Sequence, residues 1–481
     1  MQKNKIMRVI SFFIFLLFSV SVFGQRYGNV WQFGDHAGID FNSCDPINIS
    51  TGSNDGFEGC SSICNAKGQL LFYTNSDYVW NRQNTEMPNG FLTDDGGTLS
   101  QVIIIPKPLS DSVFYIVTTE IQNLQRSLQY HVVDMNLNSG LGDVVSKNNS
   151  LTTFNITEQV AATYHSNGTD IWLLVHEYGT NRFFAYLVTQ SGISSTPEIS
   201  SVGPAQDSCY SYINARGEIK FSPDGHKVAF NGNGVGNDNL SNLLSLFDFD
   251  NSTGIVSNPI DLPFSGGDFG LSFSPDNSKL YGATWKAVFF SPDEFNYLYQ
   301  FDLSSGNPST IINSKVILDS VPMSQNYGSL KIGPNGKIYV ARANTNYLGV
   351  INFPDQVGLA CDYDSTGFNL EGKTCNFGLN NYIEYTNYCD NTSVSDLKKN
   401  VNEPILFPNP LIGSSLLQFD NSTKEVCTLT LYNVFGQLVR TISEVKDDKI
   451  IIEREDLTSG LYLFRIDAGK RTIAKGKLMI E

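Results

Sequence analysis

One short pattern recurs three times in the middle of the chain, at residues 219–230, 271–283 and 330–341. The copies read IKFSPDGHKVAF, LSFSPDNSKLYGA and LKIGPNGKIYVA. Each has a hydrophobic segment, a turn that opens with Pro-Asp or Pro-Asn, and a second hydrophobic segment. Proline fixes φ at the first central position of such a turn, and the glycine of two copies allows a positive φ. Each copy therefore predicts two strands joined by a tight turn.

Weaker copies of the pattern lie at residues 64–74, 105–118 and 163–176, and a second hairpin pattern accompanies several of the copies. Four strands in a unit of about 45 to 60 residues are typical of a propeller blade. Six units can be counted between residue 57 and about residue 360. Residues 30–41 and 377–386 each add a strand without completing a unit.

The two ends of such a repeat array must meet if its sheets are to close into a ring. A blade shared by both ends would remove the open sheet edges. We therefore predict an all-β chain whose main domain is a β-propeller of six or seven four-stranded blades, with seven favoured. An array of β-sandwiches is the alternative, because nothing in the repeats fixes circularity.

The composition agrees with many strands and turns and limits the class of partner. The chain has 481 residues, of which 17% are charged and 12% aromatic, and its net charge is −16. So acidic a surface repels phosphate backbones, which argues against nucleic acid as a partner. Neutral or cationic partners, or partners bridged by divalent ions, fit the charge better.

The first 24 residues have the features of a signal peptide. Three basic residues precede the apolar run VISFFIFLLFSVSVF, and small residues stand at 22 and 24 before Gln25. The run is short for a membrane span. We expect residues 1–24 to be removed and the propeller to occupy 25–390. Disulfides are allowed in an exported chain, but the pairing of the eight cysteines stays open.

A second β unit is predicted after residue 404. Residues 391–404 are polar and lack periodicity, as expected of a linker. Beyond them, apolar and polar residues alternate at 428–433, and glycine turns separate further β segments up to residue 481. We expect residues 405–481 to form a small β-sandwich.

This tail carries four short motifs in a fixed order. They are Phe407-Pro408-Asn409-Pro410, then Tyr432-Asn433 with Gly436, then Leu457, Ser459, Gly460 and Tyr462, and last Lys475-Gly476-Lys477-Leu478. Together they resemble the type A C-terminal sorting domain of the type IX secretion system. Glu481 departs from the basic ending that is common in this family. An ordinary fibronectin-like module without a signalling role is the alternative.

The resemblance implies a route out of the cell. In that family the secretion machinery recognises the domain at the outer membrane. A cell-surface sortase then usually removes it and attaches the passenger to an anionic lipopolysaccharide, or releases it. The resemblance implies sorting-motif roles for Phe407, Pro408, Asn409, Pro410, Gly436, Gly460, Tyr462, Lys475 and Lys477.

The propeller region also resembles known proteins. FSPDG before a hydrophobic strand is similar to WD-repeat-like and PD40-type propellers. The segments NVWQFGDHAGIDFN and GQLLFYTNSDYVWN are similar to a family of secreted Bacteroidota propellers, over residues 28–390. This resemblance implies a secreted or cell-surface location more than an activity.

Two turns place carboxylates two residues apart before a glycine. They contain Asp248 and Asp250 in FDFDNSTG, and Asp362 and Asp364 in CDYDSTG. Closely spaced carboxylates can hold Ca²⁺. Neither segment is a twelve-residue calcium loop ending in Glu, and Asp before Ser, Thr or Gly is common in plain hairpin turns. Both interpretations stay open, and no other cofactor is indicated.

No catalytic motif stands out in the sequence. The five histidines lack the spacing of a zinc protease, and no serine lies in a Gly-x-Ser-x-Gly elbow. We therefore expect a binding or interaction module for a protein or glycan, and an enzyme remains uncertain. The alternative is a metal-dependent propeller hydrolase, lactonase or lyase. A cluster of carboxylates and histidines at the channel mouth would favour that enzyme, and a blocked channel would favour the binding module.

Overall fold

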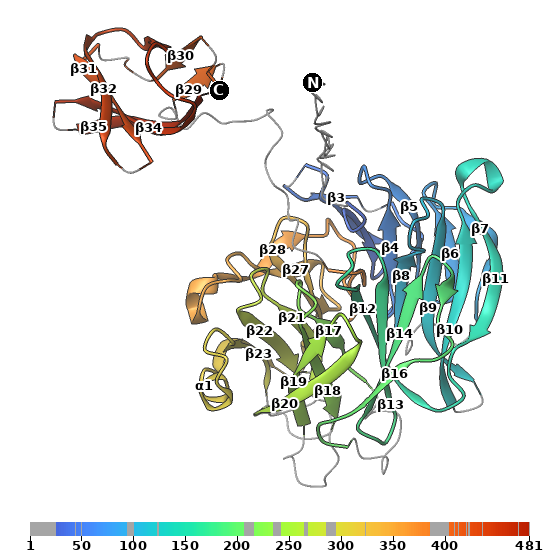
Figure 1. Cartoon of the computed structure of the whole chain (residues 1–481). Helices are drawn as coiled ribbons and strands as arrows, with labels where there is room; N and C mark the ends of the chain where they lie inside the picture. Colours follow the sequence, from blue (N-terminus) through green and yellow to red (C-terminus); the bar gives the residue numbers. More distant parts are fainter. Residues whose placement is uncertain are drawn as a thin grey trace, which may run out of the picture. The chain divides into compact units, whose positions relative to one another are not determined.

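The protein divides into two compact units, Met1–Cys389 and Asp390–Glu481, which Figure 1 colours along the chain. The computed structural model describes residues 26–43, 45–49, 51–93, 101–122, 125–205, 216–233, 242–263, 268–284, 295–322, 324–384, 404–407, 409–411, 413–419, 421, 424–434, 436–469 and 471–480. The predicted signal peptide and nearly all of the predicted linker lie outside these residues. No helix in the described part is long and apolar enough to cross a membrane.

Seven antiparallel sheets make up the described part of the first unit. The first three are β1–β3 (Val30–Phe33, Ala37–Asp40, Ile47–Asn48), β4–β7 (Ser61–Cys64, Leu70–Thr74, Tyr78–Asn81, Glu86–Phe91) and β8–β11 (Val102–Pro106, Val113–Gln122, Gln125–Asp134, Asp143–Ser150). The fourth contains β12–β16 (Ile156–Tyr164, Ile171–Glu177, Arg182–Thr189, Gly192–Ile193, Glu198–Ser201). The last three are β17–β20 (Ile219–Phe221, Lys227–Asn233, Asn242–Asp250, Ile255–Pro263), β21–β24 (Asp268–Phe273, Lys279–Thr284, Phe295–Asp302, Val316–Pro322) and β25–β28 (Asn326–Ile332, Ile338–Ala343, Tyr347–Ile351, Tyr363–Asn369). Helical turns are η1 (Asn138–Gly140), α1 (Pro308–Asn313) and η3 (Gly358–Cys361).

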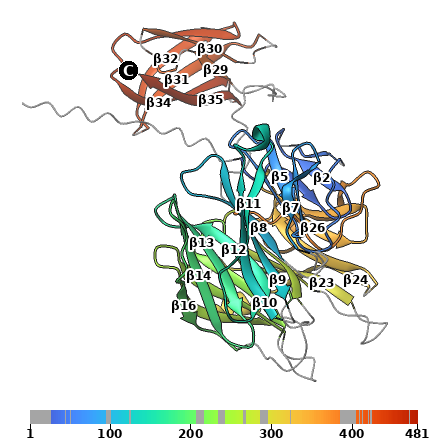
Figure 2. The same ribbon diagram turned by 90° about the vertical axis from the view of Figure 1, so that its right-hand side faces the viewer.

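The sheets follow one another in chain order and close into a ring (Figures 1 and 2). Apolar clusters join each sheet to the next; Phe72 on β5 and Phe114 on β9, for example, share one such cluster. The first sheet packs in the same way against the last, through Trp31 and Tyr339. The first strands of successive sheets contact one another in turn. The first unit is therefore a seven-bladed β-propeller, the blade count that we favoured, although its first sheet has three described strands rather than four.

The repeated turns take the predicted backbone. Gly225 and Gly336 have φ of +70° and +77°, which glycine adopts without strain. The copy that lacks this glycine places Asn277 there, at φ +64°. Asparagine tolerates this region better than other non-glycine residues, so all three turns keep the same shape.

Ring closure differs from the prediction in one respect. Residues 30–41 do form β1 and β2, but the described part of the predicted strand at 377–386 is not a strand. Thr374 makes a single bridge to Asp35, and residues 374–384, the closing segment, then run along the first strands of several blades. The strand prediction was wrong because Asn380 and Asn381 bind neighbouring backbones through their side chains rather than in a ladder.

Asn381 shows how the closing segment joins the blades. Its backbone N–H donates to the oxygen of Cys60 (2.9 Å), directly before β4. Its side-chain amide donates to the oxygens of Val102 on β8 (3.1 Å) and Val160 on β12 (3.4 Å). On the opposite side, Lys331 on β25 donates to the oxygen of Tyr382 (2.9 Å). The segment therefore occupies the middle of the ring.

The second unit is the predicted β-sandwich. One sheet contains β29, β30 and β33 (Ile405–Phe407, Ser414–Gln418, Lys449–Glu453). The other contains β32, β31, β34 and β35 (Leu438–Val445, Cys427–Asn433, Gly460–Ala468, Arg471–Ile480). Alternate side chains such as Leu429, Ile452 and Ile466 are fully buried between the two sheets. This period of two is the pattern expected when one face of each sheet is covered.

Candidate functional site

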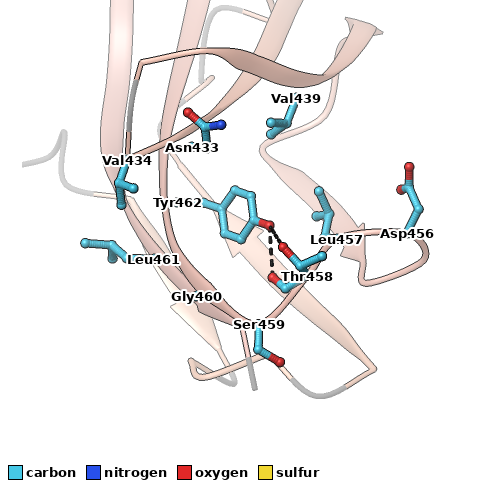
Figure 3. A pocket seen from close by; sticks show the side chains of 10 residues that line it. All are labelled: Asn433, Val434, Val439, Asp456, Leu457, Thr458, Ser459, Gly460, Leu461 and Tyr462. Atoms are coloured by element: carbon cyan, nitrogen blue, oxygen red, sulfur yellow. Dashed lines mark hydrogen bonds between the residues drawn. The ribbon is translucent and has the colours of Figure 1, made fainter.

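The β-sandwich carries a groove of about 470 Å³ at the ends of β31 and β34 (Figure 3). Its lining comes from the turn after β31, from β32 and from the turn that leads into β34. The lining residues are Asn433, Val434, Val439, Asp456, Leu457, Thr458, Ser459, Gly460, Leu461 and Tyr462. Five of these belong to the motifs that carry the sorting-domain resemblance.

Tyr462 forms the centre of this groove (Figure 3). Its hydroxyl donates to the oxygen of Thr458 (2.9 Å) and lies 3.1 Å from the Thr458 hydroxyl. The rest of the side chain is 6% exposed and packs into the sandwich core. Tyr462 therefore ties the turn at 457–460 to the core, and Gly460 begins β34 with φ +147°, a value that side chains other than glycine rarely adopt.

Tyr462→Phe is expected to loosen this turn. Loss of one buried hydrogen bond costs about 1 kcal/mol, which corresponds to roughly fivefold faster exchange of the amides that it protects. Hydrogen exchange read by mass spectrometry on peptides covering 457–463 measures this. Tyr432→Phe is the matched control, because the Tyr432 hydroxyl makes no hydrogen bond to other described residues. Unchanged amide exchange at 457–463 in the Tyr462→Phe variant would contradict the role of Tyr462 in anchoring this turn.

Apolar side chains form the walls of the groove. Val434 is 59% exposed and Val439 is 39% exposed. Asn433 fixes the turn beside them: its side chain accepts from the Gln437 N–H (3.0 Å). Gly436 has φ +76°, and a Cβ there would meet open space, so the turn needs glycine for its backbone rather than for room. Exposed apolar side chains beside a few polar groups are typical of a binding groove.

The Phe-Pro-Asn-Pro motif lies elsewhere in the sandwich. The Asn409 side chain accepts from the Met479 N–H (2.8 Å) and donates to the Lys477 oxygen (3.3 Å), so it attaches the start of the unit to β35. A cis peptide bond joins Asn409 to Pro410. Phe407 ends β29 opposite Leu416, and Pro408 lies outside the described residues.

The last motif alternates across β35. Lys475 and Lys477 are exposed, whereas Gly476 faces the core side, where a Cβ would lie 2.6 Å from the Phe464 ring. The missing side chain at Gly476 therefore leaves space for the Phe464 ring, and the two lysines are exposed to solvent. The structure brings Gly460 and Tyr462 together in the groove and leaves these lysines on a separate strand.

The propeller has a second polar region, a network of charged residues on and beside its innermost strands. Arg126 lies 3.7 Å from the Glu158 carboxylate, and both are almost completely buried. Glu218 accepts from the Ser329 hydroxyl (2.6 Å) on β25 and from the Leu271 N–H (2.7 Å) on β21. Lys331 pairs with Glu384 of the closing segment (3.0 Å). The network therefore joins the closing segment to several blades.

Two carboxylates of this network, Glu58 and Glu158, have raised pKa values. Burial raises the pKa of Glu58 to about 7, against the lowering effect of Arg216 and Arg126. Burial also raises the pKa of Glu158, and the Glu58 carboxylate raises it further. Because the buried Arg126 stays charged, it needs a carboxylate as counter-ion. The raised pKa means that Glu58 holds a proton in the folded protein at pH values where it would be ionised in the unfolded chain.

Raising the pH from 5 to 8 is expected to destabilise the propeller. The folded pKa of Glu58 lies above its ordinary value of 4.5, so the folded state binds the extra proton. The protonated Glu58 stabilises the folded state fully below pH 4.5, and this stabilisation is lost as the pH rises through about 7. The free energy of unfolding should fall by an amount of the order of 3 kcal/mol.

Urea unfolding of Glu58→Gln across this pH range tests the effect. The variant should lose most of the dependence between pH 5 and 8. The exposed Glu198→Gln serves as the matched control and should retain it. An unchanged pH dependence in Glu58→Gln would contradict the raised pKa of Glu58.

The calcium candidates take part in turn hydrogen bonds. Asp248 pairs with Lys227 (2.9 Å) and also accepts from Asn258, while Asp250 accepts from the Ser252 N–H (2.9 Å). Asp364 accepts from the Thr366 N–H (2.9 Å), and Asp362 accepts from the Asn352 amide (3.1 Å). No group of three or more metal-ligating side chains occurs within the described residues. Calcium at these turns stays a prediction.

Sequence reasoning did not find the groove walls or the inner-strand network. Val434, Val439 and Asp456 carry no motif of their own and meet only in the folded sandwich. Glu58, Glu158 and Arg126 lie far apart in the sequence with no common spacing. Charged residues in or next to apolar strand segments were the available signal, since such residues are almost never fully buried unless they are paired.

The fold defines a β-propeller followed by a small C-terminal β-sandwich. Residues 405–481 match the family described as the secretion system C-terminal sorting domain. This match confirms the type IX sorting domain suggested by the motifs, and the chain is delivered to the cell surface or beyond. A search of curated proteins finds no match.

The chain is similar to many solved structures at low identity, including the three that follow. PorZ of Porphyromonas gingivalis, a bacterial surface component of the type IX secretion system, is 10% identical with a TM-score of 0.35, over 95% of this chain and 74% of PorZ. A putative 6-phosphogluconolactonase of Bacteroides fragilis is 11% identical with a TM-score of 0.39, over 80% and 94% of the two chains. The periplasmic gluconolactonase of Pseudomonas aeruginosa is 13% identical with a TM-score of 0.37, over 80% and 94%. None of these values speaks for a shared activity.

Proposed function

We propose that this protein is a surface-displayed or released binding module, whose rigid propeller presents loops to a protein or glycan. The sorting domain delivers it, is recognised by the type IX machinery through its groove, and is then removed by the sortase. The released or lipopolysaccharide-attached propeller is the working part. A rigid scaffold that positions surface loops is a common basis for recognition.

The observation that supports binding over catalysis is the occupied centre of the ring. The closing segment takes the space where a propeller enzyme would hold its metal and substrate. Among the described residues, one cavity beside Asn381 and Glu218 has a volume of about 10 Å³, enough for about one water molecule. Two of the described carboxylates there, Glu158 and Glu384, pair with Arg126 and Lys331.

The alternative is a metal-dependent hydrolase, lactonase or lyase. Such an enzyme needs an open coordination position that substrate can reach. Elemental analysis of the purified exported chain separates the two candidates. The binding module predicts less than 0.1 transition-metal ion per chain, and an enzyme of this class predicts about one.

A binding screen tests the proposed function itself. The exported chain would be tested against a glycan array and against purified surface proteins of the same bacterium. Saturable binding that survives removal of the sorting domain supports the proposal. Lactone hydrolysis by the same preparation, with no binding partner on either panel, would overturn it.

A further inference from the structure

The last blade exposes an unusual apolar loop between β27 and β28. Phe353 is 59% exposed, Val357 54% and Leu359 74%. These three side chains, the apolar loop patch, lie within seven consecutive residues. The segment forms the orange turn beside α1 in Figure 1. Exposed apolar residues gathered in one place mark interaction sites more often than single ones do.

Buried polar side chains hold this loop in one conformation. Gln300 is 1% exposed; its amide donates to the Gln356 oxygen (2.7 Å), and its oxygen accepts from the Gly358 N–H (2.6 Å). The fully buried Tyr281 donates to the Pro354 oxygen (2.7 Å). Buried side chains therefore hold the loop backbone from the core side, while the apolar side chains of the loop are exposed. A loop fixed in this way loses little entropy when it binds a partner.

Two carboxylates lie beside the patch. The Asp276 N–H donates to the Asp355 carboxylate (3.1 Å), and both residues are exposed. Burial and the nearby Asp276 raise the pKa of Asp355, whereas hydrogen bonds from Ser278 and Ser274 lower that of Asp276. Two carboxylates so close together attract a cation more strongly than either would alone.

The net charge of the chain indicates the class of partner that fits this patch. The whole chain carries a net charge of −16. The tail at 405–481 contains ten basic and ten acidic residues, so the excess acid belongs to the rest of the chain. A second copy docked through the same patch would bring its own Asp276 and Asp355 close to these carboxylates, which disfavours self-association. A partner with basic residues beside an apolar segment is complementary to both features.

We propose that the apolar loop patch, with Asp276 and Asp355 at its edge, docks a protein segment that carries apolar side chains next to lysine or arginine. This inference rests on the proposed binding function and names its surface and the class of partner. The apolar side chains supply contact area, and the two carboxylates select the basic neighbour.

Synthetic peptides test the surface without knowledge of the natural partner. One 12-residue peptide with three leucines would be made in versions flanked by two lysines or by two glutamates. Fluorescence anisotropy with the exported chain should show at least tenfold tighter binding of the lysine version. The double variant V357S/L359S should weaken that binding at least tenfold, and D276N/D355N should abolish the preference for lysine.

Leu109→Ser is the matched control, because Leu109 is also 74% exposed but belongs to another blade. It should leave peptide binding unchanged. Absence of peptide binding, or equal binding by wild type and V357S/L359S, would overturn the patch as a docking surface. A glycan or surface protein from the binding screen that still binds V357S/L359S with unchanged affinity would preserve the proposed function and reject only this surface.

Discussion

A chain truncated after Lys373 is expected to lose the folded propeller, whereas a chain truncated after Glu384 should keep it. The eleven residues between these points are the closing segment. Phe377, Leu379, Tyr382 and Ile383 are each 3–6% exposed. Burial of such side chains contributes about 1.5–3 kcal/mol each, which together is comparable to the whole free energy of unfolding of a typical domain.

The hydrogen bonds of the segment add to this effect. Its removal would leave the oxygen of Cys60, beside β4, without the N–H of Asn381. The N–H of Ser329 would likewise lose the oxygen of Phe377, to which it donates (2.7 Å). Lys331 would remain buried without Glu384, and an unpaired buried charge is strongly destabilising. The cost of these groups comes in addition to that of the lost apolar contacts.

Near-ultraviolet circular dichroism and thermal unfolding measure the outcome. Both truncations lack the sorting domain, so they differ only in the closing segment. The shorter chain should have no fixed aromatic signal and no cooperative transition. A cooperative transition at the same temperature in both chains would show that the closing segment is not needed for the ring.

The second large effect concerns the sorting domain. Gly476→Val is expected to destabilise the β-sandwich by about 2–3 kcal/mol and to reduce the amount of exported protein strongly. A Cβ at this position would lie 2.6 Å from the Phe464 ring, which is itself buried in the core. Overpacking of this kind forces neighbouring side chains and backbone to shift. A small domain has little stability in reserve.

Gly413→Val is the matched control for this variant. No heavy atom lies within 4 Å of a Cβ at Gly413, and its φ is not in the left-handed region. It should therefore leave both stability and export unchanged. Quantitative immunoblots of culture medium and shaved cells compare the two variants. Equal export of both would contradict the role assigned to Gly476.

The hairpins and the blade count could be predicted from the sequence because their causes are local. The positive φ that a tight turn requires explains turn residues such as Gly225 and Gly336. Alternation of apolar and polar residues over a few positions predicts the strands. The seventh blade followed from the need to close the ring. The ordered motifs of the tail were specific enough to indicate the sorting domain before any fold was known.

The path of the closing segment could not be predicted in the same way. FGLNNYIEYT reads as a strand, but Asn380 and Asn381 use their amides to bind backbones of strands more than 200 residues away. The inner-strand network depends equally on the finished ring: Glu218 meets Ser329 across 111 residues of sequence. The apolar walls of the groove also lacked a local signal, since exposed valines are common in surface strands.

Surface delivery through the sorting domain is the central claim, and protease shaving of intact cells tests it most directly. The full chain and a chain lacking residues 405–481 would be expressed in a bacterium with type IX machinery. We expect the full chain to yield propeller peptides on shaving, with the tail absent from the intact mass of the surface product. The shortened chain should stay inside the outer membrane. Surface peptides from the shortened chain in equal amount would contradict the account.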